Sequence, residues 1–198
     1  MDTHRAAPAS DLSADRPWTG TVFAGVSLDG LIARVDDDIT WLEARPPADH
    51  AAARPDPVVP GFEELLTRVD HLVMGRATFQ KVLEIGAWPY DPIQVIVLSS
   101  SLAGPQPHDA LIAPSLEAAV ELLRERGARG VYWDGGATVQ AALRAGLVDE
   151  VVVTVVPVLI GAGISLFGAL PEDVALRLRG SAVLADGMVS TRYEIARS

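Results

Sequence analysis

The chain has 198 residues, of which 49% are hydrophobic and 21% are charged, and this composition excludes a wholly disordered protein. Its formal net charge of -10 at pH 7 disfavours nucleic-acid backbones and anionic membranes as partners. The absence of cysteine excludes disulfides, thiolate nucleophiles and cysteine-ligated metals, and it fits a cytoplasmic protein.

Residues 1–17 contain several aspartates among alanines and prolines, and no apolar block of signal-peptide length. We therefore expect a disordered lead-in over residues 1–17, one folded domain over residues 18–198, and a cytoplasmic location. The longest apolar run, residues 151–160, is interrupted by Thr154 and Pro157 and is shorter than the ~20 residues that span a bilayer.

The first strand is predicted at residues 21–27, where a short apolar segment ends at the turn signal Asp29-Gly30. Five prolines in residues 43–61 disfavour a long helix there and predict a loop beside an active site. Ser115 is a suitable N-cap for an amphipathic helix that ends near residue 126. Apolar spacing predicts the elements between them: helices at 62–69 and 78–85, and strands at 71–74, 94–98 and 110–113.

A strand at 131–133, a helix at 137–145 and a strand at 151–156 form a predicted βαβ unit, whose crossover makes its two strands parallel. Further strands are expected at 176–178, 183–185 and 189–195, with a hairpin turn at Asp186-Gly187. The predicted fold class is α/β, with a mostly parallel mixed central sheet, an antiparallel C-terminal hairpin and helices on both faces.

The strongest functional signal is Gly135-Gly136, which lies directly between a predicted strand and a predicted helix. Such a turn presents unpaired backbone N–H groups and the positive end of the helix dipole, which together suit a phosphate group. The alternative is a strand-to-helix turn that needs glycine only for its own backbone geometry.

Three other strands are also followed by polar residues that could line a ligand site. Arg76 and Thr78 follow one strand, and the serine run 99–101 follows the next. Asp29 follows the first strand, where it is either an active-site acid or the side chain of an Asx turn. The convergence of these strand ends suggests a nucleotide site.

Other motifs exclude several classes of site. The run Gly161-Ala162-Gly163 begins like a dinucleotide fingerprint, but Leu166 stands at the position of its last glycine. No Gly-x-Ser-x-Gly elbow occurs, and the four histidines are scattered without the spacing of a zinc helix, so we expect no metal.

The order and spacing of these motifs resemble the dihydrofolate reductase-like superfamily, and more closely the branch that contains the C-terminal reductase domain of bacterial riboflavin biosynthesis. The resemblance covers roughly residues 21–195. The motifs that carry it are Ser27-Leu28-Asp29-Gly30, Trp41, Val73-Met74-Gly75-Arg76-x-Thr78, Val97-Leu98-Ser99-Ser100, Asp134-Gly135-Gly136, Asp149-Glu150, Pro157-Val158-Leu159-Ile160-Gly161-x-Gly163 and Leu166-Phe167.

The resemblance implies that NADPH lies across the strand ends. Arg76 and Thr78 would then contact its 2′-phosphate and pyrophosphate, and Ser99 and Ser100 its adenosine side. The remaining cofactor contacts that the resemblance implies are Ala24, Gly25 and Ile32 at the nicotinamide, and Gly75, Gly135, Gly136, Ala137, Thr138 and Val139 near the pyrophosphate.

One departure from dihydrofolate reductases concerns the acid that binds the pterin about five positions after the tryptophan that matches Trp41. This chain has Pro46 there, so dihydrofolate is not the expected substrate. The candidate proton donors are Asp29, Glu43 and Asp49, and the candidate substrate-binding residues are Trp41, Arg45 and Arg54. We also expect no deaminase domain of the kind often fused to riboflavin-pathway reductases, because the chain has no cysteines with which to form its zinc site.

We therefore expect an NADPH-dependent reductase that transfers a hydride to a small heterocyclic or carbonyl substrate. One alternative is the riboflavin-pathway 5-amino-6-(5-phosphoribosylamino)uracil reductase, with Arg45 or Arg54 binding the phosphate. Another is a non-catalytic nucleotide- or ligand-binding protein on the same fold. The apolar segments 151–160 and 183–195 further predict a homodimer.

Overall fold

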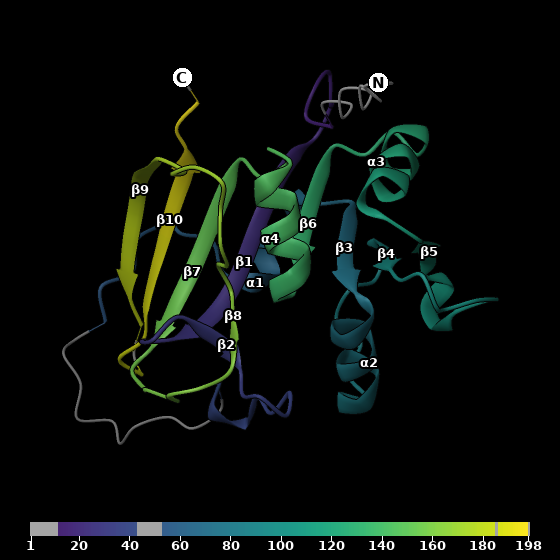
Figure 1. Ribbon diagram of the computed structural model, residues 1–198. Coiled ribbons are helices and arrows are strands. Elements are labelled where there is room, and N and C mark those ends of the chain that lie inside the picture. The colour runs from purple at the N-terminus through teal and green to yellow at the C-terminus, as the bar shows by residue number, and fades with distance from the viewer. Residues whose placement is uncertain (1–11, 43–52, 185, 198) are drawn as a thin grey trace, which may run out of the picture.

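The computed structural model describes residues 12–42, 53–184 and 186–197. Its main feature is a central sheet with helices on both faces (Figure 1). The sheet has eight strands in the order β5-β4-β3-β6-β1-β7-β10-β9. These strands are β1 (Thr19–Ser27), β3 (His71–Gly75), β4 (Gln94–Leu98), β5 (Leu111–Ala113), β6 (Gly130–Asp134), β7 (Glu150–Val156), β9 (Leu176–Val183) and β10 (Val189–Ile195).

The first six strands in that order pair in parallel, whereas β10 is antiparallel to β7 and β9 is antiparallel to β10. The predicted fold class, with its antiparallel C-terminal hairpin, is therefore confirmed. The helices are α1 (Phe62–Arg68), α2 (Arg76–Ile85), α3 (Leu116–Glu125) and α4 (Gly136–Arg144), with 3-10 turns η1 (Thr40–Leu42) and η2 (Pro107–Asp109). A separate two-stranded sheet pairs β2 (Leu31–Ala33) with β8 (Ile164–Ser165).

Three features differ from the sequence-based expectation. The predicted strands 176–178 and 183–185 are corrected to the single strand β9, because pairing with β10 across a bulge carries the strand through the polar residues 179–181. The strands β2 and β8 were not predicted, since each is short and depends on the other. Residues 12–17 of the expected lead-in pack on the domain: Leu12 contacts the core, and Arg16 pairs with Asp149 at 2.7 Å.

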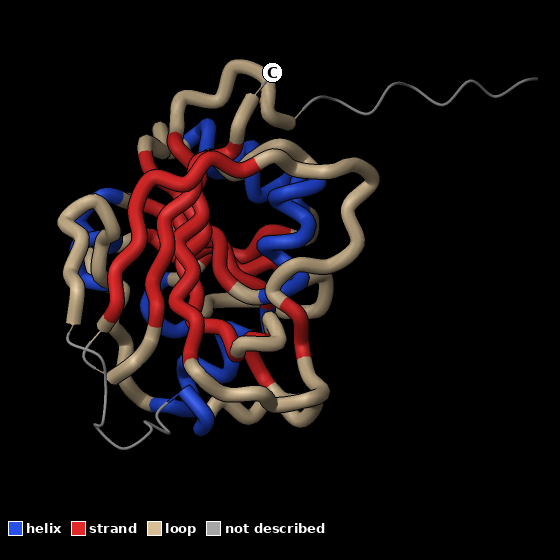
Figure 2. Tube along the Cα trace, turned by 90° about the vertical axis from the view of Figure 1, so that its left-hand side faces the viewer, coloured by secondary structure: helices blue, strands red, loops and turns tan. Residues whose placement is uncertain are grey.

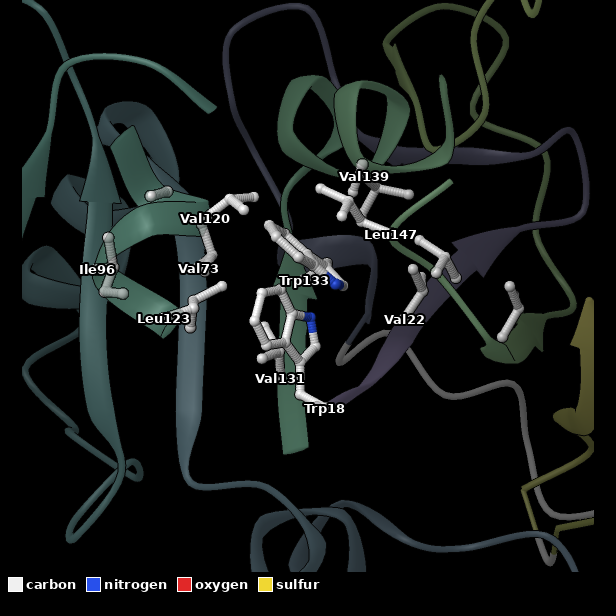
Figure 3. Close-up of a cluster of buried hydrophobic side chains, with 14 of the residues drawn as sticks. Trp18, Val22, Val73, Ile96, Val120, Leu123, Val131, Trp133, Val139 and Leu147 are labelled. Atoms are coloured by element: carbon white, nitrogen blue, oxygen red, sulfur yellow. The ribbon is translucent and has the colours of Figure 1, made fainter. Parts of the chain in front are cut away.

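The core divides into two apolar layers, one on each face of the sheet. Side chains from α3 and α4 pack with Trp18, Val22 and Trp133 on one face (Figure 3). On the other face, α1 and α2 bury Leu65 and Phe79 against β3, β4 and β6. The apolar residues predicted at helical spacing are therefore the ones that pack the helices against the sheet.

Two adjacent acids at the start of β7 bind segments that are distant in the sequence. Asp149 accepts hydrogen bonds from the backbone N–H of Gly20 and from the guanidinium groups of Arg16 and Arg197. Glu150 is buried and pairs with Arg68 of α1 and with Arg192 of β10. These charge-assisted bonds join both ends of the described chain to the centre of the sheet. No helix in the described part of the chain is long and apolar enough to cross a membrane.

The face of β9 and β10 on the α4 side is uncharged and partly uncovered. Leu176 lies opposite Ile195, and Leu178 lies opposite Tyr193, so these four side chains share a face. Leu176 is 46% exposed and Leu178 is 56% exposed. Seen from this end of the sheet in Figure 2, strands lie foremost and helices lie behind them. Although each copy has a net charge of -10, such a face would bring no like charges into direct contact between two copies.

We expect this face to join two copies of the chain, in line with the homodimer that the sequence predicts. Replacing Leu176 and Leu178 together by Glu places two charges on the face and should convert the dimer to a monomer. Light scattering at micromolar concentration measures the mass directly. Arg177→Glu, on the opposite face of the same strand, is the matched control, and this variant should have the same mass in solution as the wild type. A monomeric wild-type chain would contradict the assignment.

Candidate active site

A cavity of about 640 Å³ opens at the carboxyl ends of β1, β3 and β6. This is the end of the sheet at which α2 begins in Figure 1. Ligands collect at such strand ends in open α/β sheets. The cavity is lined by Phe23, Ala24, Gly25, Ile32, Ala33, Asp37, Ile39, Leu42, Gly75, Arg76, Ala77, Thr78, Lys81, Val82, Ile85, Leu98, Tyr132, Asp134, Gly135, Gly136, Ala137, Thr138, Ile164 and Leu166.

Two helices begin at the cavity, because the strands that precede them are neighbours. Strands β3 and β6 pair in parallel, with Met74 opposite Asp134, and each is followed at once by a helix. The first turns of α2 and α4 are therefore adjacent. Their leading N–H groups have no partner within the helix, and both helix dipoles place positive potential at the same point. This arrangement suits a bound phosphate.

The paired glycines are required by the packing of the protein itself. Gly135 has φ +86°, and a Cβ atom there would overlap Thr78 of α2. A Cβ atom at Gly136 would lie 2.8 Å from the carbonyl oxygen of Ser165. Backbone conformation and close packing therefore account for both glycines, which is the alternative that the sequence analysis left open. Both residues also line the cavity, so the same turn forms its floor.

Among the described residues, the positive side chains that line the cavity both come from α2. Arg76 and Lys81 line the cavity, and Arg76 Nη1 donates a 3.0 Å hydrogen bond to Ser101 Oγ. Ser99 shapes the loop, because its hydroxyl accepts hydrogen bonds from the backbone N–H groups of Ser101 and Leu102. Ser101 is thus the serine that binds Arg76, whereas the sequence analysis assigned cofactor contacts to Ser99 and Ser100. Ser100 is exposed, and neither Ser99 nor Ser100 lines the cavity.

Asp134 is a cavity residue to which the sequence analysis gave no role. It ends β6, and one of its carboxylate oxygens accepts a 2.8 Å hydrogen bond from the backbone N–H of Gly135. Burial raises the pKa of Asp134 from its ordinary value of 3.8 to about 6. Beside it, the buried Tyr132 hydroxyl donates to the carbonyl oxygen of Phe23 at 2.9 Å. The sequence feature that could have identified Asp134 is an acidic residue directly between an apolar strand and two glycines.

Most of the residues predicted to bind the cofactor do line the cavity. They are Ala24, Gly25, Ile32, Gly75, Arg76, Thr78, Gly135, Gly136, Ala137 and Thr138. Val139 instead belongs to the core, where it is almost completely buried. Trp41 is 3% exposed and is not among the lining residues, but Leu42 beside it lines the cavity and packs against Gly25.

Of the predicted proton donors and substrate-binding arginines, the two that the structure describes, Asp29 and Arg54, do not line the cavity. Asp29 lies outside the cavity lining, and its carboxylate accepts hydrogen bonds from the N–H groups of Ile160 and Gly161. Hydrogen bonds from Ser27 and Gly161 lower the pKa of Asp29, so this acid is suited to holding a turn. Arg54 is exposed and pairs through its backbone with β9. The candidates Glu43, Arg45 and Asp49 lie outside the described residues.

The described residues contain no group of three or more His, Cys, Asp or Glu side chains placed to hold a metal ion. The polar groups of the cavity are instead the two carboxyl groups of Asp37 and Asp134, the cations of α2, the hydroxyl groups of Thr78 and Thr138, and Tyr132. The cavity can thus bind an anion at the helix ends and hold an acid in a largely apolar pocket.

Comparison with known proteins places this geometry in a family. The family model described as the RibD C-terminal domain matches residues 19–190. The uncharacterized protein YwjB of Bacillus subtilis is 30% identical over 163 residues, which are 81% of this chain and 88% of that protein.

Solved structures share the fold. A protein of Shewanella sp. PV-4, whose name assigns it provisionally to riboflavin biosynthesis, matches with a TM-score of 0.77 at 35% identity, over 90% of this chain and 99% of its own. A diaminohydroxyphosphoribosylaminopyrimidine deaminase/5-amino-6-(5-phosphoribosylamino)uracil reductase of Thermotoga maritima matches with a TM-score of 0.61 at 18% identity, over 91% of this chain and 57% of that longer protein. The dihydrofolate reductase-like fold expected from the sequence is confirmed.

The raised pKa of Asp134 predicts a pH-dependent stability. Since the folded-state pKa lies above the ordinary value, the native protein binds the extra proton between about pH 4 and pH 6 and loses stability as the pH rises through that range. Asp134→Asn cannot titrate. Its free energy of unfolding, relative to the wild type, should therefore increase by up to about 3 kcal/mol from acidic to neutral pH, at about 1.4 kcal/mol per pKa unit.

Urea unfolding at several pH values, followed by tryptophan fluorescence, measures this difference. Asp29→Asn is the matched control: its pKa is lowered in the folded state, so removing that carboxylate should change the stability difference in the opposite direction. A stability difference between Asp134→Asn and wild type that is the same at every pH would contradict a raised pKa.

Proposed function

This chain belongs to the RibD C-terminal domain family, and we propose that it is a reductase that uses NADPH to reduce a small heterocyclic or carbonyl substrate. The observation that carries the proposal is the position of Arg76, two helix N-termini and a protonatable acid around one cavity. The first two features suit the phosphates of a dinucleotide, and the third suits a substrate that takes up a proton.

The chemistry of the donor set fits NADPH. Pyrophosphate would be bound by the leading N–H groups of α4 and α2, with hydroxyl groups from Thr78 and Thr138 at hand. Arg76, positioned by Ser101, would bind the 2′-phosphate that distinguishes NADPH from NADH. When bound, NADPH supplies the hydride.

The protein's own contribution lies in shape, exclusion of water and the movement of one proton. Ala24 and Gly25 of β1 line the cavity with little side-chain bulk, and Ile32 and Leu42 add apolar surface next to them. Asp134, with a pKa of about 6, holds a proton in part of the molecules at neutral pH. A carboxyl group in this range is suited to general acid catalysis beside hydride transfer.

Two alternatives from the sequence are separable by experiment. A riboflavin-pathway reductase needs a basic group for the substrate phosphate; of the two candidates, Arg54 does not line the cavity, and Arg45 lies outside the described residues. A non-catalytic binding protein would bind NADPH without consuming it. Oxidation of NADPH in the presence of pterins, pyrimidines and quinones, followed by absorbance, distinguishes a reductase from such a protein.

The cofactor assignment predicts a selective effect of Arg76→Ala. Loss of a charge-assisted hydrogen bond to the 2′-phosphate should weaken NADPH binding by about 1.5 to 3 kcal/mol and NADH binding much less. Titration of each cofactor, followed by its fluorescence, gives the two dissociation constants. Arg144→Ala removes the same charge at the far end of α4 and should alter neither constant. An equal loss for both cofactors in Arg76→Ala would refute the role of Arg76.

A further inference from the structure

The two walls of the cavity differ in charge. The wall formed by α2 carries the cations Arg76 and Lys81. The wall formed by residues 32–42 lies over β1, two strands away from β3 in the sheet. In the described part of that wall the one ionisable side chain that lines the cavity is Asp37, and the other lining residues there are Ile32, Ala33, Ile39 and Leu42. A ligand group next to this wall therefore meets negative charge.

Asp37 differs from the acids on either side of it. Asp36 accepts a hydrogen bond from the backbone N–H of Asp38. Asp38 accepts hydrogen bonds from the N–H and hydroxyl groups of Thr40 and pairs with Arg34 at 3.3 Å. Both carboxylates thus hold the turn. The carboxylate of Asp37 has no hydrogen bond or ion pair within the described residues, and it lines the cavity.

The backbone at Asp37 lies in a region that few non-glycine residues adopt. Its φ is 62°, in the left-handed region that glycine adopts without cost. Aspartate is among the few non-glycine residues that tolerate this conformation, so the turn accounts for the backbone at this position and leaves the residue at the lining of the cavity. Non-glycine residues in this region often mark functional sites.

A phosphate ester is poorly matched to this wall. A phosphate monoester carries about -1.5 to -2 charges at neutral pH. It would lie near the carboxylate of Asp37, with no described cation on that wall to compensate it. N–H donors of a heterocycle, in contrast, find an acceptor in the same carboxylate.

Resting on the proposed function, we propose that Asp37 is a specificity-determining residue that selects an unphosphorylated heterocycle with N–H donors and rejects the phosphorylated form. The substrate class then differs from the phosphoribosyl compound named for the Thermotoga maritima enzyme. Repulsion between the exposed carboxylate and the ligand should amount to about fivefold in affinity for each unit of ligand charge at contact distance in water.

The test compares 5-amino-6-(5-phosphoribosylamino)uracil with the same compound lacking the phosphate, each titrated calorimetrically into protein loaded with NADP⁺, which cannot donate a hydride. The unphosphorylated compound should bind at least fivefold more tightly, and added salt should reduce this ratio because the carboxylate is exposed. Asp37→Asn should bring the ratio near one, and Asp37→Lys should reverse it. Asp36→Asn removes the same charge one residue away, outside the cavity lining, and should keep the wild-type ratio.

Tighter binding of the phosphorylated compound by the wild type would overturn the proposal. So would binding of neither compound, or a ratio in Asp37→Asn equal to that of the wild type. The same titrations without any cofactor separate this proposal from the assignment of the cofactor. If NADPH fails to bind but the ratio of the two compounds still depends on Asp37, the proposed function fails and the specificity of the wall stands.

Discussion

The cavity depends on the absence of side chains at two consecutive positions. Gly135 lies against Thr78 of α2, and Gly136 lies against Ser165 of β8. A side chain at either position would separate α4 from one of these neighbours and displace the two helix ends that converge there. Because β3 and β6 are neighbours only in space, this constraint joins turns some 60 residues apart, as the pairing of Met74 with Asp134 shows. The positive potential of the cavity floor follows from that adjacency.

Local patterns in the sequence were sufficient for much of the fold. The predicted strand 94–98 coincides with β4, and Ser115 caps α3 as expected, since its hydroxyl accepts a hydrogen bond from Ala118 N–H. Apolar run length and capping are properties of neighbouring residues, so they are visible without the partner strand. The interior of β9 is different. Its residues Arg179, Gly180 and Ser181 form strand only because β10 supplies the ladder of hydrogen bonds.

The site residues also fall into two groups, those that local sequence identifies and those whose role depends on the fold. The glycines, Arg76 and Thr78 stand directly at strand ends, where sequence position alone identifies them. Asp134 and Ser101 could not be assigned, because the role of each depends on what the fold places beside it: buried surroundings for the acid and Arg76 for the serine. Asp29 shows the converse. Its carboxylate holds the backbone of Gly161, a partner 132 residues away that no local pattern could reveal.

The shared attachment of Arg16 and Arg197 to Asp149 brings the two ends of the folded chain to one place. Asp149 precedes the amino end of β7, and because β7 runs parallel to β1 this place lies at the opposite end of the sheet from the cavity. Chain ends that meet on the surface are the usual condition for circular permutation and for insertion into another protein. Insertion of this domain into another protein would therefore need two linkers that start close together, at the end of the sheet away from the cavity.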